Sequence, residues 1–214
     1  MQLEGVEFQM LGYDARRMSR GWLAQRAEGC WDMFLLRTDL LQPLSTDPAV
    51  WDSALDWHDP KVPMPDWTGP FQDLWENLDD LQKFLARRGR VAIRPYWVIA
   101  IARGRNAPAE EAAMGQHPGG LVFEYGRVNP AAQREGWELL GYDIADYFQL
   151  SGLMNCGYGG EAEDRLQFFA SRLNAFHLFD SVQDADLCRK WMDERVEEHA
   201  PFFVHALFKV REEA

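Results

Sequence analysis

Hydrophobic and polar residues alternate at both ends of the chain. Near the start, Val6, Phe8 and Met10 alternate with Glu7 and Gln9, which is the period of a half-buried β-strand. Residues 201–210 repeat the pattern, and their apolar positions share one face of a predicted C-terminal strand: Phe202, Val204, Ala206, Phe208 and Val210.

Four further segments have the composition of strands. They are residues 31–37, 90–103, 120–128 and 137–142. Pro95 lies inside the second of them, and because proline cannot donate to a ladder it predicts an edge position or a bulge there.

Other segments have the period of a helix. The clearest spans residues 71–88, where apolar residues recur at steps of three and four and Gly89 follows as a stop. Residues 49–57 follow the start signal Thr46-Asp47-Pro48. Residues 161–173 and 184–198 form two more predicted amphipathic helices, the second with Asp180 and Ser181 as candidate caps.

The order of these elements predicts a fold class. Strands and helices follow one another irregularly, which favours an α+β fold with a mixed, largely antiparallel sheet and several amphipathic helices. A chain of 214 residues fits one domain spanning 1–214, with a boundary between two sub-lobes near residues 104–119 as the alternative.

One short motif occurs twice. Leu11-Gly12-Tyr13-Asp14 returns as Leu140-Gly141-Tyr142-Asp143, each time after an apolar run. Four matching residues without a sustained period fall short of the standard for a repeat. We therefore interpret the echo as chance and leave duplication open.

Charge is distributed in three blocks along the chain, whose formal net charge is −12. Residues 30–80 carry eleven acids against two bases, and residues 135–199 carry fourteen acids against five. Residues 81–134 between them hold nine bases against three acids. A negative field repels phosphate backbones and attracts basic partners, so nucleic acid is excluded as the expected ligand. Acidic faces that only keep the protein in solution are the simpler interpretation.

The sequence lacks the standard motifs of cofactor binding and catalysis. The chain has no glycine-rich dinucleotide or phosphate loop, no Gly-x-Ser-x-Gly and no His-Glu-x-x-His. His199 and His205 are six residues apart, and we place the second on the polar face of the last strand. That spacing fits no metal site, so we expect no metal, no cofactor and no catalytic residue.

The cysteines and the absence of long apolar runs suggest a compartment. Cys30, Cys156 and Cys188 are odd in number and far apart, which favours a reducing environment over a disulfide framework. The first ten residues do not resemble a secretory signal, and the most apolar run is only strand-sized. We expect a cytoplasmic protein that does not enter a membrane.

An enzyme-like alternative lies in residues 143–160, which begin with Asp143 and end with Gly160. Carboxylates near Cys156 could transfer protons, and the glycines would let a ligand approach the backbone. The structural interpretation is a strand, a connector and a glycine turn. The alternative function is a small-ligand-binding domain or an enzyme.

The acidic segment 30–80 gives the sharper binding hypothesis, because it holds five of the nine tryptophans. Exposed tryptophans rimmed by carboxylates have the composition of an interface hot spot for a basic partner. The competing interpretation is that these aromatics pack a long loop onto the body. The candidate partner-binding residues are Asp52, Asp56, Trp57, Asp59, Asp66, Trp67 and Asp73.

In overall character the chain resembles bacterial immunity proteins, which neutralise a cognate toxin that is often a basic nuclease. Small size, acidity, tryptophan content and the lack of a catalytic motif carry the resemblance. No family motif transfers functional residues to this sequence. The resemblance implies inhibition by occlusion of the active site of a basic toxin, with no nucleic acid and no membrane as partner and with the oligomeric state open.

Overall fold

A computed structural model gives the arrangement of the chain. It describes residues 1–18, 41–43, 74–88, 97–104, 136–146, 168–169, 171–195 and 200–210. The elements in chain order are the strands β1 (Gln2–Leu3), β2 (Val6–Met18) and β3 (Leu41–Pro43), helix α2 (Leu78–Arg88), strands β4 (Trp97–Gly104) and β5 (Glu138–Ala145), helix α5 (Val182–Arg195) and strand β6 (Phe203–Lys209).

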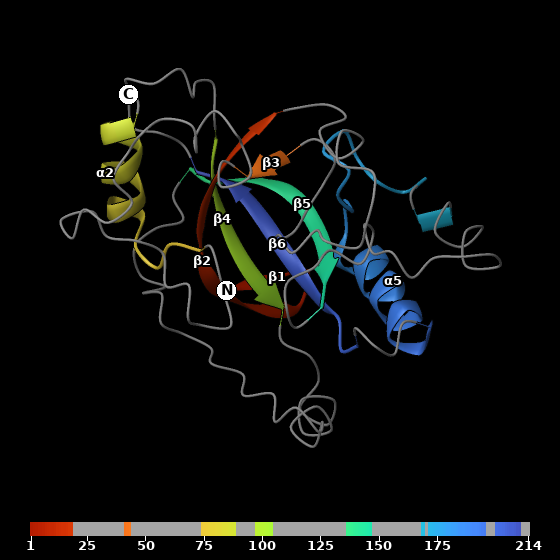
Figure 1. Cartoon of the computed structure of the whole chain (residues 1–214). Helices are drawn as coiled ribbons and strands as arrows, with labels where there is room; N and C mark the ends of the chain where they lie inside the picture. The colour runs from red at the N-terminus through yellow and green to blue at the C-terminus, as the bar shows by residue number, and fades with distance from the viewer. Residues whose placement is uncertain are drawn as a thin grey trace.

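The strands form one curled sheet in the order β1-β2-β4-β6-β5, and β3 lies off this path and pairs with the end of β2 (Figure 1). Every pairing between these strands is antiparallel. Helix α2 lies against β2, and α5 lies against β5 and β6. The described part is therefore an antiparallel sheet with two helices, which agrees with the predicted α+β class, whereas the further predicted helices are not shown.

Strands β1 and β2 are joined by the two-residue turn Glu4-Gly5. Both residues have positive φ, 49° and 84°, as a tight hairpin turn that matches the strand twist requires. The Glu4 carboxylate accepts hydrogen bonds from the Tyr142 hydroxyl at 3.1 Å and from the Val182 amide at 3.0 Å. These two bonds connect the hairpin to β5 and to the start of α5, and they help to hold Glu4 in its left-handed conformation.

Three strand predictions are confirmed. The alternation at residues 6–10 continues as β2, and residues 137–142 overlap β5. In the C-terminal strand, the five residues predicted to share a face all belong to one apolar cluster. Strand β4 begins at Trp97, within the predicted segment 90–103. The predicted strands 31–37 and 120–128 and the helix 49–57 lie outside the described residues.

The predicted helix 71–88 starts too early. Residues 74–77 are not helical, because Trp75 exchanges two backbone hydrogen bonds with Tyr13 of β2, at 2.8 and 2.9 Å. Asn77 then begins the helix, and its Oδ1 accepts the Asp79 amide at 2.9 Å. The apolar period continues through the bridge, but pairing with the sheet takes precedence over helix formation.

Helix α5 confirms the predicted cap at Ser181. Its hydroxyl accepts the Asp184 amide at 3.1 Å and donates to the Asp184 carboxylate at 3.1 Å, so Ser181 satisfies an amide of the first turn as an N-cap residue does. The predicted helix 161–173 is wrong at its end, because residues 171–173 form a turn and a bridge from Leu173 to Phe179.

The sheet separates two sets of buried residues. Residues of both helices, among them Leu81, Leu85, Ala185 and Met192, belong to one large cluster with one face of the sheet. The opposite face carries a smaller cluster centred on Ile99, Ile101 and Leu207. Apolar burial on this scale is the main stabilising contribution in a domain of this size.

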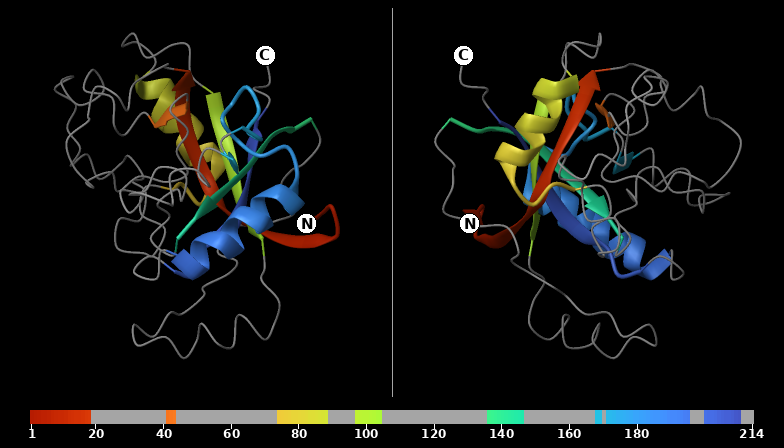
Figure 2. Two further views of the ribbon diagram at one scale, coloured as in Figure 1. Left: turned by 90° about the vertical axis from the view of Figure 1, so that its right-hand side faces the viewer. Right: turned by 60° about the vertical axis from the view of Figure 1, so that its left-hand side comes forward.

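The two copies of the echoed motif occupy equivalent places. Each contains a register shift, between Met10 and Gly12 in β2 and between Leu139 and Gly141 in β5. Tyr13 bridges to Trp75 and Tyr142 bridges to Phe179, each bridge preceding a helix. Figure 2 shows β2 and β5 at opposite sides of the central strands. The echoed residues therefore occupy equivalent positions in the fold.

Candidate functional site

The residues predicted to bind a partner lie outside the described part of the chain. Asp52, Asp56, Trp57, Asp59, Asp66, Trp67 and Asp73 fall in the range between Pro43 and Leu74. The structure therefore neither brings these residues together nor separates them.

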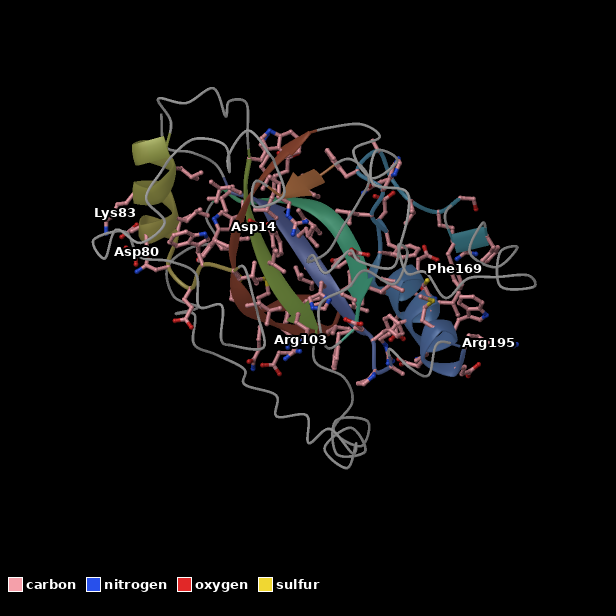
Figure 3. All side chains as sticks on the ribbon, viewed as in Figure 1. Asp14, Asp80, Lys83, Arg103, Phe169 and Arg195 are labelled. Atoms are coloured by element: carbon pink, nitrogen blue, oxygen red, sulfur yellow. The ribbon has the colours of Figure 1, made fainter. Side chains whose placement is uncertain are left out.

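The sheet instead presents a set of buried ionisable side chains on one face. Asp14, Arg16, Arg103, Asp143 and His205 alternate with residues that contact the helices, so they point to the opposite side. Each is at most 8% exposed. Figure 3 shows Asp14 and Arg103 at opposite ends of the sheet. Buried charge is costly without compensating partners, so this face is the candidate functional site among the described residues.

At the first end, Asp14 and Arg16 form an ion pair on β2. The Arg16 Nε lies 3.0 Å from the Asp14 Oδ2, and the Ala15 amide donates to Oδ1 at 2.7 Å. Burial raises the pKa of Asp14, while the guanidinium and these hydrogen bonds act in the opposite direction. Each side chain therefore helps to compensate the buried charge of the other.

At the second end, three ionisable residues lie side by side on neighbouring strands. His205 of β6 is in register with Arg103 of β4 on one side and with Asp143 of β5 on the other. The Arg103 guanidinium lies over the Phe203 ring, 4.8 Å from its centroid. Asp143 accepts the Ile144 amide at 2.8 Å. We call these three residues the polar row.

The imidazole of His205 is neutral in the folded protein. Burial lowers its pKa to about 3, and the Arg103 charge acts in the same direction. Its Nδ1 lies 3.1 Å from the Phe203 carbonyl oxygen, so the neutral ring carries its proton there and Nε2 is left as a hydrogen-bond acceptor. The polar row thus combines a cation, an acceptor and a carboxylate, which together can hold a small polar group.

The described cysteine is not a candidate nucleophile. Cys188 of α5 is buried and free, and burial raises its pKa, with the nearby Asp143 charge adding to the effect. A thiol that stays protonated reacts slowly. The part of the chain that the structure describes contains no group of three His, Cys, Asp or Glu residues placed to hold a metal ion, and no helix there is long and apolar enough to cross a membrane.

Sequence reasoning missed most of this face. It placed His205 on a polar strand face, but the residue is 1% exposed, on a strand that lies between β4 and β5 in the sheet. Arg103 follows the apolar run of β4 and gave no indication of chemistry. Asp143 was part of the alternative site 143–160, and the structure places it inside β5. The sequence signal that would have identified these positions is a charged residue at a place in a strand where the alternation predicts a buried side chain.

Comparison of the chain with protein-family models, with curated proteins and with solved structures finds no match.

Proposed function

We propose that this chain is an acidic protein-binding protein, an immunity-type inhibitor that neutralises a basic toxin such as a nuclease by occluding its active site. The observation that carries the proposal is the coincidence of eleven carboxylates and five tryptophans within residues 30–80. Carboxylates would meet the cationic groups with which the toxin binds its own substrate. Trp57 and Trp67 would act as apolar anchors beside them.

Charge on the described surface supports the same partner. Among side chains whose exposure is described, seven exposed residues are acidic and four are basic. The proposal takes the chain as a single cytoplasmic α+β domain in which further amphipathic helices accompany α2 and α5. The surface is acidic beyond residues 30–80 as well. An experiment therefore has to distinguish the effect of the acidic segment 30–80 from the effect of the overall negative charge.

Neutralisation in cells tests the proposal. The open reading frame beside the gene for this chain is expressed from an inducible promoter, and growth is measured with and without co-expression of this chain. We expect the neighbouring product to arrest growth, and co-expression of the parent chain to restore it. The double variant Trp57→Ala and Trp67→Ala should fail to restore growth while it remains folded by circular dichroism.

A matched control separates the acidic segment from net charge. One variant carries Asn at Asp52, Asp56, Asp59 and Asp66, and the control carries Gln at Glu7, Glu138, Glu194 and Glu213, so both lose four negative charges. The proposal predicts that only the first variant loses protection. Equal protection by both variants would contradict the assignment of the acidic segment, and a neighbouring product without toxicity would contradict the immunity role.

The polar row favours a second candidate, a small-ligand-binding domain or enzyme that uses the segment 143–160. Asp143 lies beside a neutral imidazole acceptor and two strands from a buried guanidinium, a combination that suits a singly charged acid such as dihydrogen phosphate. Titration of the isotope-labelled protein with inorganic phosphate tests it. Saturable shifts of the His205 and Asp143 amide resonances, lost in His205→Ile, support it, and unchanged spectra exclude phosphate.

A further inference from the structure

Apart from the short strands β1 and β3, the described elements form two series with the same order. Each series begins with a strand that contains the Leu-Gly-Tyr-Asp motif, continues through a backbone bridge to that strand and a capped helix, and ends with a central strand. The first series consists of β2, the Trp75 bridge, α2 and β4. The second consists of β5, the Phe179 bridge, α5 and β6. We call residues 6–104 the first unit and residues 137–210 the second unit.

The correspondence extends to individual hydrogen bonds. Tyr13 and Trp75 exchange backbone bonds of 2.8 and 2.9 Å, and Tyr142 and Phe179 exchange two bonds of 2.8 Å. In each helix the capping residue, Asn77 or Ser181, also accepts the amide four residues later through its carbonyl, at 3.2 Å in both.

The registers of the sheet relate the two units by a local two-fold axis. Ile101 pairs with Leu207 at the centre of the interface between β4 and β6, and Ala102 pairs with Ala206 next to it. On the outer sides, Gly12 pairs with Ile101 and Gly141 pairs with Leu207. The axis therefore passes between Ile101 and Leu207, perpendicular to the sheet, because antiparallel partners are related in this way.

On the face of the sheet that carries the helices, contacts between the units occur in pairs related by the same two-fold axis. Phe8 of the first unit packs against Tyr142 of the second, with ring centroids 5.9 Å apart. Tyr13 of the first unit packs against Trp137, which directly precedes β5, at 6.1 Å. Phe8 and Trp137 are equivalent positions, as are Tyr13 and Tyr142, so the two contacts are copies of each other.

Contacts on the opposite face are also duplicated. The Arg103 guanidinium of β4 lies 4.8 Å from the centroid of the Phe203 ring of β6. The Lys209 ammonium of β6 lies 4.1 Å from the Trp97 ring of β4. Each strand thus places an aromatic residue at its start and a cation at its end, and pairs both with the other strand.

Sequence identity does not produce this agreement, because most equivalent positions differ. Ile99 is equivalent to His205, and Arg16 is equivalent to Ala145. The residue types change while the register, bridges, caps and contacts between the units are retained. Two units that resembled each other only by chance would not be expected to share the strand register, the bridges, the caps and the contacts between the units.

We propose that the two units are copies of one ancestral unit joined in tandem, and that the interface between β4 and β6 is self-complementary, of the kind that joins identical subunits. Each of these two strands should therefore be able to pair with a second copy of itself. The same patch on both sides is the property of a two-fold interface between identical chains. The proposal goes beyond the proposed function and does not depend on it.

Making the interface identical on both sides within the full chain tests this directly. The variant Phe203→Trp, His205→Ile, Leu207→Ile and Lys209→Arg gives β6 the side chains that β4 presents on that face. On that face, the variant β6 then contacts β4 with the same side chains that a second copy of β4 would present. We expect a cooperative melt less than about 5 °C from that of the parent, because volumes and contact types are retained.

A control with the same composition reverses the order of the new residues. It carries Phe203→Arg, His205→Ile, Leu207→Ile and Lys209→Trp, which places two guanidinium groups against each other at one end of the interface. We expect this control to melt at least about 15 °C below the parent, because a second buried cation faces Arg103 without compensation.

The reciprocal variant guards against a local packing failure in β6. It carries Trp97→Phe, Ile99→His, Ile101→Leu and Arg103→Lys and so gives β4 the side chains of β6. Near-parental melting of either variant supports a self-complementary interface. If both variants melt as far below the parent as the reversed-order control, the interface is not self-complementary and the proposal is overturned.

Discussion

Gly12 and Gly141 allow a second backbone segment to approach β2 and β5 closely. A Cβ atom at Gly12 would lie 2.8 Å from the Trp75 carbonyl oxygen, and one at Gly141 would lie 2.8 Å from the Phe179 carbonyl oxygen. Gly141 also has a φ of +144°, which L-residues rarely adopt. The repeated glycine is therefore required by the bridge that each unit makes.

A series of alanine substitutions separates these effects. Gly5→Ala should cost about 1 kcal/mol, because its φ of +84° is unfavourable but no atom lies within 4 Å. Gly12→Ala should cost about 2 kcal/mol through overpacking, and Gly141→Ala about 3 kcal/mol or more, because strain adds to overpacking. Urea unfolding gives the three free energies, and a Gly141→Ala variant no less stable than Gly5→Ala would contradict the close approach.

His205 should make stability depend on pH. Its folded pKa of about 3 lies below the ordinary 6.5, so between these values the unfolded chain binds a proton that the folded chain does not. The free energy of unfolding is therefore highest above pH 6.5 and falls as the pH is lowered, by up to about 1.4 kcal/mol per pH unit from this residue.

The variant His205→Ile isolates that contribution. Isoleucine occupies the equivalent position in the first unit as Ile99, so the substitution fits a place that the fold already fills with an apolar side chain. We expect the stability of the variant relative to the parent to rise by about 2 kcal/mol between pH 7 and pH 5. The difference is measured by urea unfolding at each pH. An imidazole resonance of His205 that titrates near pH 6.5 would contradict the burial.

At the scale of elements, α2 is positioned by two buried leucines. Leu81 is 1% exposed and Leu85 is 3% exposed, whereas Leu78 at the start of the helix is only half-buried. The first turn carries Asp79 and Asp80, which favour the positive end of the helix. Leu81 and Leu85 therefore hold the helix in the core, and the Trp75 bridge decides where the helix begins.

Leu81→Asp should unfold the protein or lower its free energy of unfolding by about 4 kcal/mol, because it places an unpaired charge in the main cluster. Gln82→Asp in the same turn is the control, and we expect a change within about 0.5 kcal/mol, because that side chain is exposed. Thermal melts of both variants are compared with the parent. Similar melting of the two variants would show that the helix register is wrong.

For the whole molecule, charge governs encounter more than folding. Replacement of Asp52, Asp56, Asp59 and Asp66 by Asn should slow association with the proposed basic partner and reduce the salt dependence of the association rate, with little change in melting temperature. Surface plasmon resonance over a salt series measures this. An unchanged rate at low salt would exclude electrostatic steering by these residues.

The tryptophans should act on dissociation instead. Trp57→Ala or Trp67→Ala removes a proposed anchor, and an anchor of this kind contributes about 2 kcal/mol or more to a complex, so the dissociation rate should rise by about thirtyfold. The same sensor measures it, with Trp137→Phe as a control, because Trp137 packs within the sheet against Tyr13 and Phe208. Equal dissociation of the anchor variants and the parent would assign these tryptophans to packing.

The sequence alone determined those elements whose local pattern agrees with their tertiary surroundings. Alternation placed β2 and β6, and strand-like composition placed β5. The candidate caps Asp180 and Ser181 lie just before the start of α5 at Val182, although the helix was predicted to begin at 184. These signals work because period and capping chemistry are set by neighbouring residues. It also determined the charge distribution, which no fold can change. The partner-binding residues derived from that distribution remain a prediction.

Tertiary structure decided everything that depends on residues far apart in the chain. It converted Leu74 and Trp75 from the expected helix into a bridge, because Gly12 of β2 leaves room for their backbone. It buried His205 between Arg103 and Asp143, because β6 became a central strand. It also showed that the two short motifs are equivalent, since strand register is set by pairing across the sheet and a single strand does not encode its partner.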